Sequence, residues 1–420
     1  MVSALGACTV LGLALLPDEP RRPVVALAPG IVEFDAEMSV PGMAVVEGHS
    51  TGSTVRASDR FRGRALFVTS GSTGVTFRNF TIDGNRAVLE QRTGLPDSIT
   101  PFSRFTRANG ILAEDARMVR IHNVHFREIA GFAVLVARSR HIFIRGVRVE
   151  DSGSRNPEGK NNTTGGILLE GGASGFDVSF NRFRNVRGNG VWTHSRYTDP
   201  RNGPGRIAHN GFDIIGRDAV QVGHATGVTV EANSGSRIGF PPDEVDALPV
   251  GVDTAGNVDR SKYVSNRFQE INGKCLDLDG FHHGEVRGNI CVNVMGGFGI
   301  VMNHFNPDMR PEGVVIAENE IHGAKFGALF AIGSGNRIVR NKFLNLNYAR
   351  CGCPYTPEDP RLLEAGIYLA RGTVRPAPAH RNVIRDNVIT GFGMAQNCIV
   401  AAPGVDGSKN EIADNVCRER

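Results

Sequence analysis

The sequence lacks the features of a helical or membrane-spanning protein. No long stretch repeats its apolar residues with the 3.6-residue period of an amphipathic helix. The apolar run MVSALGACTVLGLALL is short for a membrane span, which needs about 20 residues. Large amphipathic aromatics are also scarce, with one Trp and five Tyr among 420 residues. These absences argue against a helix bundle and a membrane-spanning protein, and they suit a narrow core.

The net charge and the cysteine spacing indicate little about function. The formal net charge of +4 is only a faint hint of an acidic partner, and we expect no nucleic-acid partner. Cys351 and Cys353 form a CxC without further ligands at zinc spacing. Two other pairs occupy equivalent positions in the sequence, and either disulfides or buried thiols explain them: Cys275 with Cys291, and Cys398 with Cys417.

What the sequence has is a repeated asparagine. It lies three residues after an apolar residue, in segments such as VSFNRF, IAENEI and IRDNVI. Repeats of this length predict stacked units rather than a globular core. We interpret the asparagine as a corner residue that tolerates left-handed backbone angles and whose amide can hydrogen-bond from coil to coil. The repeat comprises Asn181, Asn210, Asn233, Asn266, Asn289, Asn319, Asn341, Asn387 and Asn415.

Short strands alternate with these corners. Segments such as GGILLEG, NGVWTHS, KCLDLDG and FGIVMNH place apolar residues at alternate positions. This period indicates strands with one buried face, and equivalent strands one coil apart should pair in parallel. We therefore predict an all-β chain, a right-handed parallel β-helix with an Asn ladder, about ten to twelve coils, and a strand, turn, strand, asparagine corner in each coil.

The whole repeat resembles the pectin-lyase-like superfamily of secreted polysaccharide-active proteins. The resemblance begins near Val24, and we expect one domain over residues 23–420. It implies a secreted, periplasmic or cell-surface protein. Residues 1–22 are interpreted as a damaged or incomplete export signal, or as an N-terminal cap. This architecture serves hydrolases, lyases, epimerases and noncatalytic adhesins, so the fold does not decide the reaction.

The strand pattern predicts which side chains face outward. If Val191, Val220 and Leu276 point inward, the next residue and the one two later point out. The central coils then gather polar groups on one outer face, where crowded carboxylates should have raised pKa values. This reading puts Trp192 and Gln221 in a column with Gly251 and Asp277, and puts His194, Asp253, Asp279 and Asn303 in a second column, with His224 and His304 just beyond.

Three aspartates are the candidate acids and bases. Asp277 and Asp279 share a face two residues apart, roughly 6.5–7 Å, and Asp253 is expected about 5 Å from Asp279. These spacings match inverting and retaining glycosidases respectively. We assign Asp277 and Asp279 as the acid and base, with Asp253 tuning or replacing one of them, and His304 and His194 as further catalytic candidates.

The order of these residues partly resembles that of polygalacturonases. In that family an aspartate, an aspartate pair and a histidine lie on successive coils, as do Asp253, the pair in LDLD, and His304 here. The sequence departs from the family because Leu278 separates the two central acids and no Arg-x-Lys follows on the next strand. The resemblance implies hydrolysis of an acidic polysaccharide.

Two other function classes fit the same residues. A lyase would bind Ca²⁺ through Asp253, Asp277 and Asp279 and use a basic residue such as Lys274 to remove a proton, and a uronate epimerase would use the same face. Without calcium chemistry we expect no cofactor. The third class is a noncatalytic glycan-binding or adhesin-like β-helix.

Several residues bordering the acids are candidates for substrate binding. Trp192 is assigned as a sugar-stacking platform in preference to burial under a loop. Outward leucines at Leu112, Leu135 and Leu168 require a cover, either the segment 85–109 or a second copy of the chain in a homo-oligomer. The remaining binding candidates are Gln221, His224, Asn303, His282, His283, Arg196, Arg201, Arg310 and Lys274.

Overall fold

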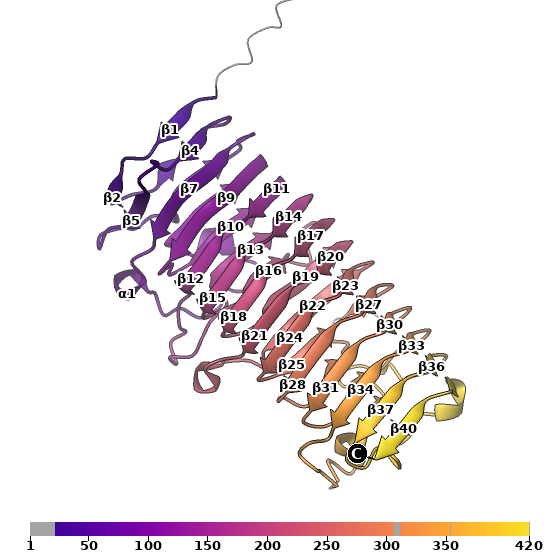
Figure 1. The fold of residues 1–420 in the computed structure, drawn as a ribbon. Coiled ribbons are helices and arrows are strands. Elements are labelled where there is room, and N and C mark those ends of the chain that lie inside the picture. Colours follow the sequence, from indigo (N-terminus) through magenta and orange to yellow (C-terminus); the bar gives the residue numbers. More distant parts are fainter. Residues whose placement is uncertain (1–21, 306–310, 353, 420) are drawn as a thin grey trace, which may run out of the picture.

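The chain is an elongated solenoid of parallel strands, seen along its length in a computed structural model that describes residues 22–305, 311–352 and 354–419 (Figure 1). The predicted export signal falls almost entirely outside these residues. Each coil contributes three strands, one more than the sequence predicts, because the segment on each side of the asparagine corner is a strand of its own. The solenoid is a right-handed parallel β-helix, as predicted, with slightly more coils than expected.

The three strands of successive coils stack into three faces. The first face comprises β1 (Val24–Ala26), β4 (Val45–Glu47), β7 (Thr76–Asp83), β9 (Arg117–Arg127), β11 (Arg140–Arg145), β14 (Phe176–Ser179), β17 (Gly205–Ala208), β20 (Val228–Glu231), β23 (Lys262–Val264), β27 (Glu285–Arg287), β30 (Val315–Ala317), β33 (Arg337–Val339), β36 (Val383–Arg385) and β39 (Glu411–Ala413). The long strands β7 and β9 continue onto the second face, which joins both faces into one 26-stranded sheet.

The second face follows the asparagine corner. It comprises β2 (Gly30–Phe34), β5 (Ser53–Ala57), β12 (Arg148–Ser152), β15 (Arg182–Val186), β18 (Gly211–Ile215), β21 (Ser234–Ile238), β24 (Arg267–Ile271), β28 (Ile290–Val294), β31 (Glu320–Ala324), β34 (Lys342–Leu346), β37 (Val388–Gly391) and β40 (Val416–Glu419). Aromatic side chains stack beneath it in register, with the rings of Phe183 and Phe212 5.0 Å apart. The core is therefore a column of apolar side chains enclosed by the three faces.

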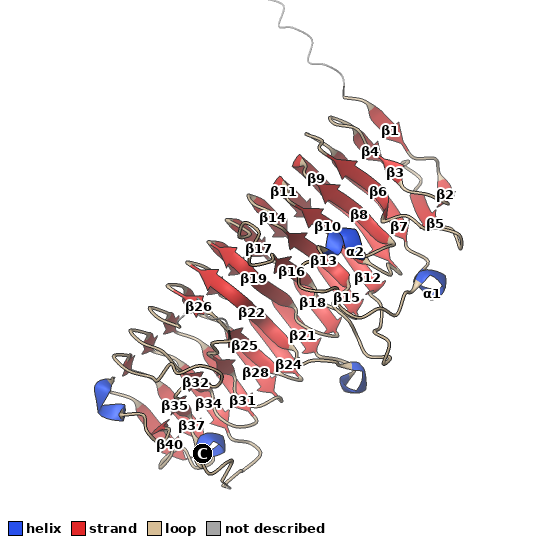
Figure 2. Ribbon diagram, turned by 180° about the vertical axis from the view of Figure 1, so that it is seen from behind, coloured by secondary structure: helices blue, strands red, loops and turns tan. Residues whose placement is uncertain are grey.

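The third face is a separate 14-stranded sheet, labelled in Figure 2. It comprises β3 (Met38–Ser39), β6 (Ala65–Ser70), β8 (Asn109–Glu114), β10 (Phe132–Ala137), β13 (Gly165–Glu170), β16 (Val191–His194), β19 (Val220–Thr226), β22 (Val250–Asp259), β25 (Lys274–Leu278), β29 (Ile300–Val301), β32 (Leu329–Ala331), β35 (Ile367–Leu369) and β38 (Ile399–Ala401), with β26 (Phe281–His282) beside β22. This is the face that the alternating strands of the sequence predict.

The nine asparagines form the predicted ladder. Each amide oxygen accepts bonds from the preceding asparagine, so that Asn233 donates to Asn266 and Asn266 donates to Asn289, each at 2.9 Å. The left-handed angle belongs to the residue before the asparagine, a correction to the sequence interpretation. Phe180, His209 and Ser265, for example, have φ values of 58, 54 and 56°. Gly288 takes the same position at 64°, where glycine is unstrained.

Two disulfides between described residues lie in the later coils. Cys275 of β25 is bonded to Cys291 of β28, and Cys398 is bonded to Cys417 of β40. The first bond joins the third face to the second face within one coil, directly before Asp277 in the chain. Of the two explanations that the sequence left open for these pairs, the structure shows disulfides.

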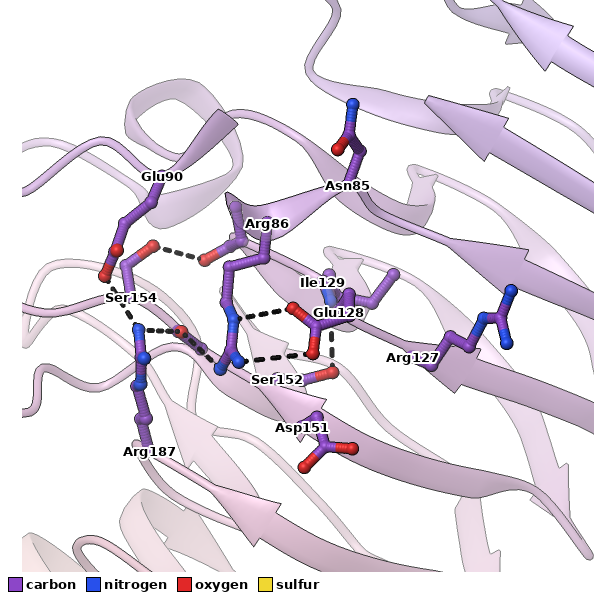
Figure 3. A network of polar contacts seen from close by, with 12 residues as sticks. Asn85, Arg86, Glu90, Arg127, Glu128, Ile129, Asp151, Ser152, Ser154 and Arg187 are labelled. Atoms are coloured by element: carbon purple, nitrogen blue, oxygen red, sulfur yellow. Dashed lines mark hydrogen bonds and ion pairs between the residues drawn. The ribbon is translucent and has the colours of Figure 1, made fainter. Parts of the chain in front are cut away.

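The segment 85–109 leaves the solenoid and folds over the third face. It contains α1 (Arg86–Leu89) and α2 (Phe102–Phe105), and α2 lies in front of β10 and β13 (Figure 2). Ion pairs anchor its start, because Arg86 lies 3.1 Å from Glu128 and Glu90 lies 2.8 Å from Arg187 (Figure 3). The three single turns elsewhere are η1 (Pro242–Glu244), η2 (Leu362–Glu364) and η3 (Gly407–Lys409).

Candidate active site

Strand register places three polar side chains in one outward column. Gln221 of β19 is paired with Asp253 of β22, and Asp253 is paired with Asp277 of β25. Asp253 therefore lies one strand spacing, about 4.8 Å, from Asp277 and not beside Asp279 as the sequence interpretation had it. The error is a two-residue offset in the VGVDTAG coil, which keeps Asp253 outward but moves it from the second column to the first.

A fourth aspartate joins the group. Asp218 precedes β19, and its carboxylate accepts a 2.9 Å bond from the amide of Val250. Burial raises the pKa of Asp218 to about 7, and its charge in turn helps to raise the pKa of Asp253. We call Asp218, Asp253, Asp277 and Asp279 the acid cluster. Asp218 is a residue that the sequence interpretation missed.

Neighbouring groups give the clustered carboxyls different environments. Burial raises the pKa of Asp253 well above its usual range, followed by the charges of Asp218 and Asp277. The amide of Gln221 donates a 2.6 Å bond to Asp253, and its own oxygen accepts one from Asn189. Asp253 is only half-buried, so it remains accessible from outside.

Asp277 is the carboxylate of the cluster that forms an ion pair with a lysine. Burial raises its pKa, while an ion pair with Lys274 and a 3.2 Å bond from the amide of Asn303 oppose that rise. Both partners were predicted as binding residues, and the structure places them on the acid cluster. These contacts favour the ionised form of Asp277.

Asp279 lies two residues further on and faces the loops. It accepts a 2.8 Å bond from the backbone amide of Phe305, and burial raises its pKa to about 6. Asp279 is half-buried and the Phe305 ring is exposed. His304 is buried beside this contact. A carboxyl with this pKa, near an exposed aromatic ring, is a suitable proton donor in mildly acidic solution.

An exposed tyrosine borders the cluster from the other side. Tyr197 follows β16, is 63% exposed, and packs edge-on against the ring of His224 with centroids 5.0 Å apart. A Cβ at Gly256 would lie 2.4 Å from the Tyr197 hydroxyl, so the tyrosine reaches the strand beside Asp253. Burial, followed by the charge of Arg201, lowers the pKa of His224. Tyr197 is a second residue that the sequence interpretation missed.

His194 and Trp192 do not join the acid cluster. Trp192 is 7% exposed, and Phe102 of α2 packs edge-on against it at 5.0 Å. The tryptophan is therefore buried under a loop, which corrects its assignment as a sugar platform. His194 lies under the same ring at 5.4 Å, and burial lowers its pKa to about 4. Its strand is three coils away from that of Asp279.

The same loop explains the outward leucines. Phe102 and Phe132 pack with Leu112, Leu135 and Leu168, none of which is exposed. The amide groups of Phe102 and Ser103 donate to the buried carboxylate of Glu170 at 3.0 and 2.8 Å, which holds α2 in place. The segment 85–109 is thus the cover that the sequence anticipated, and the leucines give no support to a homo-oligomer.

The other predicted binding residues lie elsewhere or are engaged. Arg196 is paired with Asp199 at 2.6 Å, and Arg201 with Asp259 at 2.7 Å. His282 is paired in register with Asp259, and His283 lies 3.9 Å from Glu312, so both histidines belong to the corner beyond the face rather than to the acid cluster. Arg310 lies outside the described residues.

Metal and membrane features were sought in the same residues. Within the described ranges, no group of three or more His, Cys, Asp or Glu side chains is arranged to hold a metal ion, the set of Asp253, Asp277 and Asp279 included. No helix of the described chain is long and apolar enough to cross a membrane.

Comparison with solved structures identifies the fold. A family 28 exopolygalacturonase from Yersinia enterocolitica matches with a TM-score of 0.56 at 9% identity, covering 87% of this chain and 71% of the other. The protein has the pectin-lyase-like β-helix fold. The catalytic unit of a GH87 α-1,3-glucanase from Streptomyces thermodiastaticus matches with a TM-score of 0.55 at 12% identity, over 93% of this chain and 64% of that one.

A surface adhesin shares this β-helix fold equally well. The surface adhesin PfbA of Streptococcus pneumoniae matches with a TM-score of 0.56 at 14% identity, covering 77% of this chain and 90% of the adhesin. No family model matches the sequence, and no curated protein matches it. At these identities the likeness extends to the fold alone, so the function has to be argued from the acid cluster.

Proposed function

We propose that the protein is a secreted glycoside hydrolase that cleaves an acidic polysaccharide on the third face of its β-helix. The observation that carries the proposal is the pair Asp277 and Asp279, two residues apart and in different electrostatic environments. Two carboxyls with separated pKa values can divide the roles of base and acid. Carbohydrate-active and glycan-binding proteins among the structural neighbours support the general class.

In this proposal Asp279 is the general acid and Asp277 the general base. Asp279, with a pKa of about 6, protonates the leaving oxygen, while Asp277, ionised beside Lys274, activates a water molecule. Asp277 lies near the end of β25 and Asp279 in the turn directly after it, and the proposal takes the inverting geometry, in which about 6.5–9.5 Å between the carboxyl groups leaves room for water. Asp253, paired in register with Asp277, tunes that carboxylate, while burial and then the charges of Asp218 and Asp277 raise the pKa of Asp253 itself.

Lys274 has a positioning role in this scheme. A lyase would need a free base to remove a proton from the sugar, whereas the side-chain nitrogen of Lys274 is engaged in an ion pair with Asp277. This contact favours hydrolysis over proton abstraction.

The test is a panel of polysaccharides: polygalacturonate, alginate, α-1,3-glucan and dextran. We expect new reducing ends without ultraviolet-absorbing unsaturated product, and a loss of about 10²–10⁴-fold in D277N and D279N. Asp177→Asn on the first face is the matched control and should keep full activity. Activity should fall as the pH rises through about 6, because Asp279 then loses the proton that it donates.

Other outcomes would replace this function. Unsaturated product that disappears with a chelator would identify a calcium-dependent lyase, and a changed sugar without chain cleavage, read by NMR, would identify an epimerase. Binding of a glycan without any change in it would identify an adhesin-like module, the class to which PfbA belongs.

A further inference from the structure

A hollow on the described surface lies on the second face, away from the acid cluster. It is a groove of about 520 Å³ over β15, β18, β21 and β24. That volume is within the range of small-ligand sites in proteins, about 300–1,000 Å³. Nothing in the proposed hydrolysis uses this face, so the groove needs an explanation of its own.

Strand register explains why the surface is hollow here. One outward column reads Arg182, Gly211, Ser234 and Arg267 on four successive coils. The glycine and serine in the middle leave space, while the arginines rise at the two ends, three strand spacings or about 14 Å apart. The groove therefore runs along the solenoid between two guanidinium groups.

The arginines of the groove have no acidic partners of their own. Among the ion pairs of the described residues, none involves Arg182, Arg184 or Arg267, and all three side chains are exposed. Several arginines elsewhere on the strands lie beside a carboxylate, as Arg237 does beside Asp213. Three unpaired guanidinium groups around one hollow leave a local excess of positive charge.

The two acids that line the groove are already engaged by groups outside its lining. Glu150 lies 3.0 Å from His125, and Asp213 accepts bonds of 3.0 and 2.7 Å from Arg237. Gln269 adds a neutral amide that can donate to a hydroxyl or accept from one. The free hydrogen-bonding capacity of the groove is thus mostly cationic and suited to anionic oxygens.

We propose that this groove is a second binding site, which holds a strand of anionic polysaccharide along the solenoid axis. Carboxylate or sulfate groups spaced along the chain contact Arg182 at one end and Arg267 at the other, with Arg184 beside the first. The sugar rings occupy the space left by Gly211 and Ser234. The inference does not depend on the acid cluster, since the two sites lie on different faces.

The test measures binding of dextran sulfate, polygalacturonate and neutral dextran by isothermal titration calorimetry, at low and at physiological salt. We expect the two anionic chains to bind, neutral dextran not to bind, and affinity to fall as salt rises. The double variant R182Q/R267Q should bind about tenfold more weakly than the parent. Ser234→Phe, which fills the groove without changing charge, should weaken binding to a similar extent.

A matched control removes the same charge elsewhere. Arg117 and Arg140 are exposed, adjacent on the first face, and outside the groove, so R117Q/R140Q should bind like the parent. Equal losses in both double variants would show only diffuse attraction and would overturn the proposal. So would unchanged binding in Ser234→Phe. Tighter binding of a single-stranded DNA oligonucleotide than of either polyanionic glycan would assign the groove to nucleic acid instead.

Discussion

At the residue scale, the asparagine corners divide two tasks that the sequence had given to one residue. The left-handed backbone angle falls on the preceding position, occupied by residues as different as Phe180, Ser265 and Arg340. The side-chain amide of the asparagine itself forms the hydrogen bonds of the ladder. The pattern was visible because the short asparagine side chain supplies two N–H donors and a carbonyl acceptor, and the ladder uses both kinds of group. The preceding position varies too much to be recognised.

Asp218 gives a pH-dependent prediction. Burial raises its pKa from 3.8 to about 7 in the folded chain. Below pH 4 the carboxyl is protonated in both the folded and the unfolded chain. As the pH rises toward 7 it ionises in the unfolded chain before it does so in the folded chain, so the free energy of unfolding falls. Asp218→Asn, which cannot ionise but keeps the acceptor for Val250, should match the parent near pH 4 and exceed it by ~4 kcal/mol at pH 8. Denaturant unfolding at both pH values measures this.

The control for that experiment is Asp177→Asn, outside the acid cluster, which should show the same small effect at both pH values. If Asp218→Asn were less stable than the parent at pH 8, the carboxylate would be making a favourable contact there. The linkage of Asp218 to Asp253 would then have the opposite sign.

Tyr197 gives a prediction for substrate affinity. Its exposed ring lies beside His224, in reach of the strand that bears Asp253. Under the proposed function the ring stacks on a sugar, so Tyr197→Ala should raise KM about tenfold and change kcat little. Tyr197→Phe keeps the ring and should behave like the parent. A fall in kcat with unchanged KM in Tyr197→Ala would instead place the hydroxyl in the chemical step.

At the element scale, the alternation of inward and outward side chains in each third-face strand could be predicted from the sequence. The register of each strand with its neighbours could not always be predicted. In β22 the segment VGVDTAG alternates equally well in two alignments that differ by two residues. The sequence interpretation took Val250 as the first inward residue, but β22 starts two residues before the position paired with the start of β19, and Val252 is the residue paired with Val220. Only the pairing of Val252 with Leu276 decides that Asp253 faces Asp277.

Asp218 escaped the sequence reading because it lies at the corner before its strand and outside the outward columns. A signal was present, since Asn189 occupies the equivalent position one coil earlier, two residues before the first inward valine. The two residues are linked, because the backbone amide of Asp218 donates a 3.2 Å bond to the side-chain oxygen of Asn189. Residues at equivalent corners of successive coils can therefore be aligned in the same way as residues on the strands. The burial of Trp192 was less accessible, because it depends on a long loop with no repeat.

Glu170 gives a prediction about that loop. Its buried carboxylate accepts the amides of Phe102 and Ser103, which hold α2 over Trp192. Glu170→Ala removes both acceptors, so α2 should detach and expose the ring. Because Trp192 is the only tryptophan, its fluorescence emission should shift to longer wavelength and acrylamide should quench it more. Glu170→Gln, with one acceptor left, should show a smaller shift. Unchanged emission in Glu170→Ala would mean that apolar packing alone holds α2.

At the scale of the whole molecule, the solenoid separates its surfaces by function. The third face carries the acid cluster and its loops, the second carries the basic groove, and the corner between the first and second faces carries the ladder. The repeat in the sequence predicted the ladder and the third face because both are periodic. The groove was not predicted, since it arises from the small residues Gly211 and Ser234, which interrupt a column that the sequence analysis never aligned.

The ladder couples the coils in one dimension, so the cost of breaking it should depend on position. Asn266 in the middle bonds to Asn233 on one side and Asn289 on the other and is fully buried. Asn415 ends the ladder, receives bonds only from Asn387, and is half-buried. Asn266→Ala leaves buried donors and acceptors on both sides without hydrogen-bond partners and should lower the free energy of unfolding by about 3 kcal/mol. Asn415→Ala should lower it by about 1 kcal/mol.

Denaturant unfolding of both alanine variants, followed through Trp192, measures the two losses against the parent. Asn415→Ala is the internal control, because it removes the same side chain from the equivalent corner of the last coil of the ladder. Equal losses would mean that each asparagine stabilises its own corner alone. A larger loss at Asn266 means that the amides act as one continuous chain, so that stability passes from coil to coil beneath the acid cluster and the groove alike.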